Sequence, residues 1–459
     1  MVTIRTQVTT RTRELRKRSV AHIFHTFGVP NVEPELIFEK GKGITLTDAD
    51  GKEYLDMCSF FHCCSLGYGR KELVDAIYEQ MNKLSFTPSI YLCSNIPAIE
   101  YAEALAKFTP KSINHFFFCN SGSEANETAI KIARANWWAQ GKATKLKIIC
   151  LNDAYHGSTI AVHGLIGDPE DRVPFGPDPP GIIRIPNYNC YRCQLGLKYP
   201  DCGIECAKTI EKVIEEEGED TIAAFIAEPV QGVGGGVSPP PEYFPMVREI
   251  CSRRNVLWID DEVMTGFCRT GKNFCVDHWN VEPDLMTMAK GINGAHVPMG
   301  ALGVGDKVYT ALASQPLICG FTNSGQPTGC AAAQVALDIY IREKICEHVT
   351  KVGNRVRERL EKEFLPLPYV GNIGGLGLMQ SVEIVADKAT RLRFPTGTNL
   401  RSLLLERCLE QGLVPRIYSD RRHDRLAFAP PLIITEEEAD RELDILYSVL
   451  AGLKDLKIK

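Results

Sequence analysis

Short runs that are apolar throughout alternate with helical segments over the middle of the chain, from about residue 114 to residue 310. The runs are HFFFC, KIICL, AAFIA, VLWID and DLMTMA. Strands of a parallel sheet covered on both faces show such unbroken hydrophobicity, whereas half-exposed strands alternate. The pattern therefore predicts an α/β fold with a mostly parallel central sheet, with ligands at the carboxyl ends of its strands.

The pattern changes on both sides of this region. Residues 43–56, GITLTDADGKEYLD, predict a hairpin, because two β-rich runs flank Asp-Ala-Asp-Gly. Further helices are expected over residues 1–30, 71–84, 97–108, 331–362 and 435–455. Short strands follow Pro366 and Pro368, so both ends of the chain are expected to form a second, smaller α/β domain. We expect residues 1–64 and 331–459 to form this domain, and residues 65–330 to form the large one, with an insertion near 188–208.

Composition excludes several classes of protein. The chain is 44% hydrophobic and 24% charged with a net charge of −5, which is ordinary for a globular protein. It has no basic stripe with interleaved aromatics, so no nucleic-acid partner is expected. No apolar run approaches the roughly 18–20 residues that span a bilayer, and no secretory signal is visible. The first twenty residues are basic, which fits a solvated arm or helix or, alternatively, a transit peptide.

The chain has 17 cysteines, many of them inside apolar runs. Without a secretory signal they indicate reduced core thiols and a cytoplasmic location. Four of them lie close together in sequence, at Cys190, Cys193, Cys202 and Cys206. Their spacing fits no standard zinc finger well, so a structural zinc or iron–sulfur site and free or oxidisable thiols both stay open. No catalytic metal is expected.

The segment Asn120-Ser-Gly-Ser-Glu-Ala-Asn-Glu127 follows one predicted strand and opens a helix. A helix start offers free N–H groups and a positive dipole end, and glycine allows a tight turn, so the segment can hold a phosphate. The alternative is helix capping, because Ser121-x-x-Glu124 fits a capping box.

Two further segments carry groups that are costly to bury. The run VLWID ends in three consecutive acids, Asp260, Asp261 and Glu262. Such acids need a cation, a metal or a protonated ring nitrogen, unless one of them only caps the next helix. Lys290 ends the run DLMTMA, where desolvation would lower the lysine pKa and make the amine a nucleophile for a carbonyl. The alternative is a solvated lysine.

The order of these three sites, with the segments around them, resembles the class III (ω-amino acid) aminotransferases of pyridoxal 5′-phosphate fold type I. The resemblance extends from about Gly41 to Ala439. Matching segments in order are GITLTDADGKEYLD, SGSEANETAIKIAR, AYHGST, AEPVQG, DEVMTGFCRTGK, MAKGI, GFTNSGQPTG and FAPPLIIT. It implies a fold type I transferase with a large cofactor domain and a small domain built from both termini.

The resemblance also implies roles for individual residues. Lys290 is expected to bind the cofactor as a Schiff base and to shuttle the proton, and Asp261 to pair with the pyridine nitrogen. The other cofactor contacts it implies are Ser121, Gly122 and Ser123 at the phosphate, Thr322 of a neighbouring subunit, Tyr155 and Val263 on the ring faces, His156, and Glu228 near the entrance. From packing alone, Tyr155 and Val263 would be ordinary core residues, and Glu228 could cap a loop.

The substrate contacts implied are His62, Tyr91, Tyr155 and Arg416. Arg416 is expected to pair with a substrate carboxylate and to swing away for amines that lack one; the alternative is a surface arginine. Three places depart from the family pattern. The segment Ser59–Cys64, which brings His62 near the substrate, stands where many relatives have an aromatic residue, commonly Trp. Gln326 replaces the usual His or Asn, and Met264 stands where some have Gln. These departures bear on the substrate and not on the cofactor.

The expected activity is therefore a ping-pong transfer from an amine or ω-amino acid to a 2-oxo acid such as pyruvate, in a homodimer or dimer of dimers with shared active sites. An aminomutase or a decarboxylating transaminase would use the same lysine and aspartate, so the motifs separate these reactions poorly. The third hypothesis is a cofactor-free metal-binding or regulatory protein with the same fold.

Overall fold

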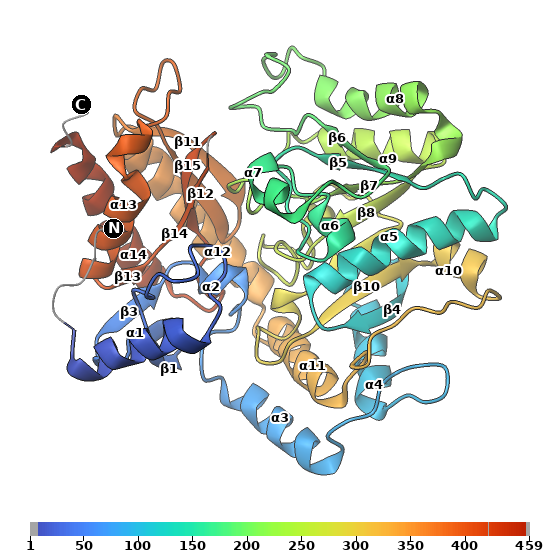
Figure 1. The fold of residues 1–459 in the computed structure, drawn as a ribbon, viewed down its shortest axis with the longest axis horizontal. Coiled ribbons are helices and arrows are strands. Elements are labelled where there is room, and N and C mark those ends of the chain that lie inside the picture. Colours follow the sequence, from blue (N-terminus) through green and yellow to red (C-terminus); the bar gives the residue numbers. More distant parts are fainter. Residues whose placement is uncertain (1–7, 421, 456–459) are drawn as a thin grey trace.

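The computed structural model describes residues 8–420 and 422–455, which form two lobes (Figure 1). The larger lobe contains a seven-stranded sheet in the order β4-β10-β9-β8-β7-β5-β6. Its strands are β4 (Ile113–Cys119), β5 (Lys147–Leu151), β6 (Ile182–Ile185), β7 (Ile222–Ala227), β8 (Leu257–Asp261), β9 (Leu285–Met288) and β10 (Gly300–Gly305). β10 runs antiparallel to both of its neighbours, and the β6, β5, β7, β8 and β9 pairs are parallel. The prediction of an α/β fold with a mostly parallel sheet is confirmed.

The sheet is buried on both faces, as its apolar strands predict. In β5, Ile149 and Leu151 pack into one core cluster, while Ile148 and Cys150 pack into another. The second cluster lies under α5 (Gly122–Ala139) and α10 (Asp306–Leu312), and the first extends to α4 (Ile96–Ala106), α8 (Glu205–Glu217), α9 (Tyr243–Arg253) and α11 (Pro327–Arg342). The remaining helices of this lobe are α3 (Lys71–Lys83) and the short α6 (Ile160–His163) and α7 (Pro169–Arg172).

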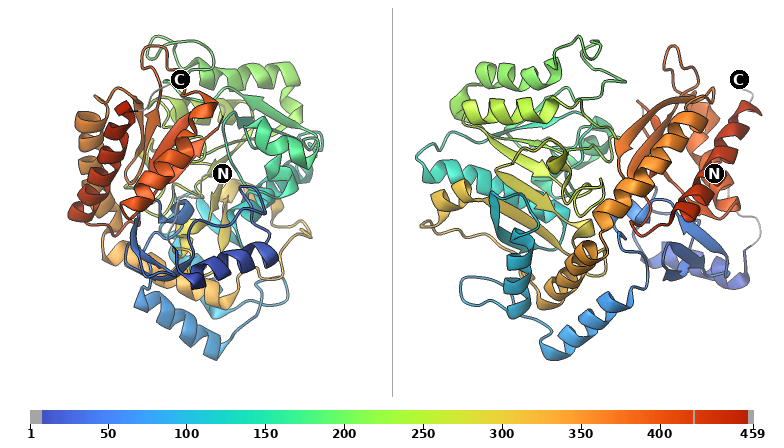
Figure 2. Two further views of the ribbon diagram at one scale, coloured as in Figure 1. Left: turned by 60° about the vertical axis from the view of Figure 1, so that its left-hand side comes forward. Right: turned by 180° about the vertical axis from the view of Figure 1, so that it is seen from behind.

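The smaller lobe joins both ends of the chain (Figure 2). One sheet has the order β1-β2-β3-β13, in which β3 of the N-terminal hairpin pairs in parallel with β13 near the C-terminus. The other has the order β11-β12-β15-β14. The strands are β1 (Phe38–Lys42), β2 (Thr45–Asp48), β3 (Glu53–Asp56), β11 (Val370–Leu376), β12 (Met379–Ile384), β13 (Leu413–Val414), β14 (Arg416–Ser419) and β15 (Asp424–Phe428), and the helices are α1 (Thr10–His22), α2 (Ser59–His62), α12 (Ile345–Arg359), α13 (Leu400–Glu410) and α14 (Glu436–Ala451).

Two of the expected helices differ from those observed. The expected helix over residues 331–362 is two helices, α11 and α12, because Lys344 adopts a left-handed φ of 52° between them. The expected helix over residues 1–30 is only α1, which ends at His22, and residues 1–7 lie outside the described residues. Within the described chain, no helix combines the length and hydrophobicity that crossing a bilayer requires.

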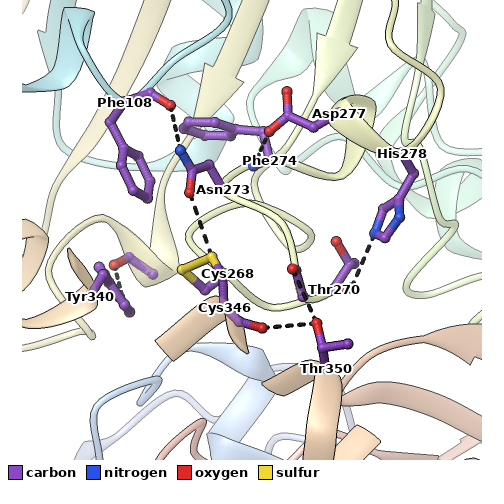
Figure 3. The surroundings of a disulfide bond; sticks show 12 residues. Phe108, Cys268, Thr270, Asn273, Phe274, Asp277, His278, Tyr340, Cys346 and Thr350 are labelled. Carbon is purple, nitrogen blue, oxygen red and sulfur yellow. Dashed lines mark hydrogen bonds between the residues drawn. A yellow bond between two sulfur atoms is a disulfide. The ribbon is translucent and has the colours of Figure 1, made fainter. Parts of the chain in front are cut away.

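One pair of cysteines is joined, contrary to the expectation that all are reduced. Cys268, on the loop after β8, forms a disulfide with Cys346 in the first turn of α12 (Figure 3). The two residues are 78 positions apart in sequence, so only the packing of the loop against the helix brings their Cα atoms to 4.6 Å. The disulfide therefore ties the loop that follows the acidic strand end to a helix of the smaller lobe.

Candidate active site

A cavity of about 190 Å³ lies where β7, β8 and β9 end and α5 begins. This is the edge of the sheet at which the fold predicts a ligand. The residues that line it are Gly122, Ser123, Asn126, Tyr155, His156, Gly157, Glu228, Asp261, Val263, Met264, Ala289 and Lys290. We call it the inner cavity.

The first turn of α5 faces the inner cavity with almost no side chain in the way. A Cβ added at Gly122 would come within 2.8 Å of the Val263 side chain, and one at Gly157 would lie 2.5 Å from Ser123 Oγ. Ser121 does not line the cavity: its hydroxyl accepts the Glu124 N–H at 3.2 Å and caps the helix. The capping and anion-binding interpretations of this segment are thus compatible, since capping leaves the free N–H groups of Gly122 and Ser123 at the cavity.

Asp261 lies at the end of β8 with its carboxylate held on three sides. Asn126 Nδ2 donates to Oδ2 at 2.8 Å, His156 Nδ1 lies 2.7 Å from the same oxygen, and the Val263 N–H donates to Oδ1 at 3.0 Å. Asn126 is itself oriented by Thr287 Oγ1, which donates to its Oδ1 at 2.8 Å. These contacts fix the orientation of a buried carboxylate that faces the cavity.

The acids on either side of Asp261 lie away from the inner cavity. Asp260 is fully buried, and neither of its oxygens has a hydrogen-bond partner. Burial raises the pKa of Asp260 well above its usual value and raises the pKa of Glu262 to about 7. The neighbouring charges of Glu262 and Asp261 add to the shift of Asp260, so its buried position favours the protonated form.

Asp260→Asn should therefore stabilise the protein increasingly as pH rises. A raised pKa in the folded state means that folding favours the protonated acid, so wild-type stability falls as pH rises from about 4 through about 7 and beyond. Asparagine imitates the protonated acid and cannot ionise. We expect its melting temperature to exceed that of wild type by a few degrees at pH 8, with a much smaller difference at pH 5. Melting temperatures of the two proteins that change in parallel from pH 5 to pH 8 would contradict a buried Asp260 that is protonated in the folded state.

Lys290 follows β9 at a left-handed φ of 46° and lines the inner cavity. In the described chain it forms no ion pair, and desolvation lowers its pKa. A larger fraction of its amine is consequently neutral near pH 7 than for a solvated lysine. The structure thus brings together a buried amine, an oriented carboxylate and a helix N-terminus around one cavity.

Glu228 and Tyr155 meet at the rim of the inner cavity. Glu228 Oε1 accepts the Tyr155 N–H at 3.0 Å, and Oε2 accepts the Gly232 N–H at 2.8 Å. Burial raises the pKa of Glu228 to about 7. The carboxyl group therefore orders the backbone that carries Tyr155, whose side chain lines the cavity.

A larger cavity of about 400 Å³ continues outward from the same lysine, and we call it the outer cavity. It shares Tyr155, Met264 and Lys290 with the inner one, and Arg416 forms part of its wall. Arg416 is consequently not an ordinary surface arginine, since it and Lys290 face the same space.

The other predicted contacts lie elsewhere. His62 is 2% exposed and lines neither cavity, whereas its neighbour Phe61 lines the outer one. Burial, with the charges of Arg269 and Lys290, lowers the pKa of His62 well below its usual value. Tyr91 is 98% exposed and Thr322 is exposed, and neither lines either cavity of this single chain. The roles of these three residues stay predictions.

The departures at Met264 and Gln326 also have structural places. Met264 lines both cavities, as Lys290 does. Gln326 caps α11, because its Oε1 accepts the Gly329 N–H at 2.7 Å.

The cysteine-rich loop is separate from this site. Its four cysteines line a small cavity of about 20 Å³ together with Tyr188 and Tyr199. Burial raises the pKa of Cys190 to about 11 and that of Cys206 to about 12, so both are thiols at neutral pH. Among the described residues, no group of three or more His, Cys, Asp or Glu side chains is arranged to hold a metal ion. This statement includes the four cysteines of the loop.

Sequence reasoning missed Asn126 and Thr287, which orient Asp261. Asn126 looks like any polar residue of a helix, so nothing marked it. The sequence could have indicated Thr287, because it is the polar position inside the buried strand LMTM. A hydroxyl within a buried strand needs a hydrogen-bond partner, and here that partner belongs to the site.

Comparison with known proteins gives one consistent result. The family model of the class III aminotransferases matches residues 27–450. The chain is 38% identical over 418 residues to a probable aminotransferase of Mycobacterium tuberculosis, covering 90% of this chain and 89% of the relative. It is 36% identical over 416 residues to the putrescine–pyruvate aminotransferase of Pseudomonas aeruginosa, covering 90% of each. A crystal structure of an (S)-enantioselective ω-transaminase from Thermomicrobium roseum matches with a TM-score of 0.91 and 37% identity, covering 98% of this chain and all of that one.

Proposed function

Since the chain belongs to the class III aminotransferases, we propose that it is a pyridoxal 5′-phosphate-dependent transaminase that moves an amino group from an amine or ω-amino acid to pyruvate. The transfer between an amine donor and a 2-oxo acid is the activity of the family. The cofactor, the acceptor and the residue roles are our proposal. The observation that carries it is the convergence of Lys290, Asp261 and the start of α5 on the inner cavity.

The residues of the inner cavity fit this cofactor. The glycine-lined first turn of α5 leaves room for a phosphate at its positive end, next to the Ser123 hydroxyl. Tyr155 and Val263 are apolar surfaces for the faces of a ring, and Asp261 is an anion for a ring nitrogen. His156 Nε2 is buried without a hydrogen-bond partner, which leaves a polar atom in the wall for the cofactor to satisfy.

The protein's part in the reaction follows from these positions. Bound pyridoxal phosphate supplies an electron-withdrawing ring that stabilises negative charge on the substrate carbon. Lys290 Nζ, neutral in a larger fraction because its pKa is lowered, would take the proton from the carbon bearing the amino group and would then donate it to a second carbon. Asp261 holds a proton at the ring nitrogen, and Asn126 and His156 keep its carboxylate in place. The cavity walls limit the access of water to the reacting carbon.

Two further elements of the proposal concern assembly and location. We propose a homodimer or a dimer of dimers in which Thr322 of one subunit contacts the phosphate in the other, because Thr322 lines neither cavity of its own chain. We also propose a cytoplasmic location, because the chain is rich in cysteine. The Cys268–Cys346 disulfide argues against that location.

An amine panel tests the reaction. Putrescine, 4-aminobutyrate and β-alanine are offered as donors, with pyruvate or 2-oxoglutarate as acceptor, and the products are measured by chromatography. We expect alanine to form from pyruvate in a one-to-one ratio with the donor consumed, and pyruvate to be the better acceptor. Putrescine is included because a relative is named for it. Release of carbon dioxide, or a positional isomer of the donor without consumption of the acceptor, would contradict transamination and favour the decarboxylating or mutase reactions.

A further inference from the structure

The guanidinium of Arg416 lies against two aromatic rings. Its central carbon is 4.2 Å from the centre of the Phe61 ring and 4.8 Å from the centre of the Tyr418 ring. Tyr418 is on the same strand as Arg416, but Phe61 comes from the opposite end of the sequence. A cation held over two ring faces is attracted by both, so its position is restricted in a way that a solvated arginine's is not.

This guanidinium has no anionic partner in the protein. Arg416 forms no ion pair with any described carboxylate, and its Nε is buried without a hydrogen-bond partner. It lines the outer cavity together with Lys290, and its charge contributes to the lowered pKa of that lysine. The rings therefore hold, near the amine of Lys290, a positive charge that no described carboxylate neutralises.

The backbone that carries Phe61 is in an uncommon conformation. All four residues of α2, from Ser59 to His62, have positive φ values, of 40°, 34°, 61° and 64°. Such conformations cost free energy for residues other than glycine and gather at functional sites. Ser59 Oγ fixes the segment by donating to the Ala429 carbonyl at 2.7 Å, and Arg269 donates to Ser59 Oγ at 3.2 Å.

Because of this conformation, the rings of the two neighbouring phenylalanines point in different directions. The Phe60 ring packs edge-on against Phe38 at 5.5 Å, away from both cavities. The Phe61 ring remains 41% exposed in the wall of the outer cavity, over Arg416. The Phe61 ring is thus placed against the guanidinium and not in the apolar core.

We propose that Phe61 is a positioning residue that, with Tyr418, holds Arg416 in the outer cavity and thereby sets the preference of the enzyme for substrates that carry a carboxylate. A donor or acceptor with a carboxylate meets a guanidinium already in place. An amine without one has to displace the guanidinium from both rings or leave it uncompensated. The inference rests on the proposed transaminase function and deepens it, because it names the class of substrate that the outer cavity selects.

Phe61→Leu tests the proposal, since it keeps an apolar side chain of similar size and removes the ring. Both half-reactions are followed by the absorbance of the bound cofactor, with β-alanine and pyruvate as carboxylate substrates and n-butylamine as a donor without one. We expect KM for the carboxylate substrates to rise about tenfold with kcat within about twofold, and kcat/KM for n-butylamine to stay equal or increase. Phe61→Tyr, which keeps the ring, should restore the wild-type values.

Phe60→Leu is the matched control, because it alters the same strained turn without touching Arg416. The proposal is overturned if Phe61→Leu leaves KM for carboxylate substrates unchanged, if it lowers kcat/KM equally for all three substrates, or if Phe60→Leu has the same effect. Failure of the proposed function itself looks different, since wild-type protein would then show no half-reaction with any of these substrates.

Discussion

Replacing Lys290 with alanine is expected to lower the rate of transamination by at least about a thousandfold while the protein remains folded. In the proposed mechanism the lysine supplies both the amine that holds the cofactor and the base that moves the substrate proton, and removal of such a base alone costs about 10²–10⁴ in rate. Its side chain faces a cavity and forms no ion pair within the described chain, so its loss breaks no structural contact of that kind. Steady-state formation of alanine from pyruvate measures the effect.

Lys307→Ala is the control for the loss of a lysine, because Lys307 is exposed in the first turn of α10, away from both cavities. It should retain wild-type turnover. Equal melting temperatures for wild type and Lys290→Ala would show that the fold is intact. A folded Lys290→Ala variant with turnover near that of wild type would refute the assignment of this residue.

The second large effect is expected from Asp261→Asn. Asparagine fills the same space but carries no charge, so nothing would hold the proton on the ring nitrogen and the ring would withdraw electrons less strongly. Breaking a buried charge pair costs about 3–5 kcal/mol, which corresponds to a loss of about two to four orders of magnitude in kcat. Asn126 and His156 would keep partners in the variant, so cofactor binding should weaken less than catalysis.

Asp260→Asn makes the same chemical change one residue earlier, on a side chain that does not line the inner cavity. We expect it to keep most of the wild-type kcat. Equal losses in the two variants would show that the effect comes from disturbing β8 and not from the loss of the charge at position 261.

The sequence was sufficient to predict the sheet and to select Asp261 and Lys290 as candidate site residues, because both rest on local patterns. Unbroken apolar runs such as Ile222–Ala227 occur where both faces are covered, and all six of its residues are buried. Asp261 and Lys290 each follow such a run, where burying a charged side chain without a partner costs free energy. Their meeting at one cavity follows from β8 and β9 being parallel neighbours.

Other features depend on packing between distant segments, so the local sequence pattern does not indicate them. β10 is rich in glycine and alanine and lies between β4 and β9, with a direction opposite to both. A Cβ at Gly303 would come within 2.4 Å of Ile113, so small residues mark close packing here and not weak strand propensity. The disulfide and the left-handed turn at Phe61 likewise depend on contacts with α12 and Ala429.

The most direct measurement of the central claim is the position of the covalent link between the cofactor and the protein. Wild-type protein supplied with pyridoxal phosphate is reduced with sodium borohydride, digested and analysed by peptide mass spectrometry. We predict a phosphopyridoxyl group on the peptide that contains Lys290 and on no other lysine. An unlabelled Lys290 in active protein, or a label on a different lysine, would contradict the account.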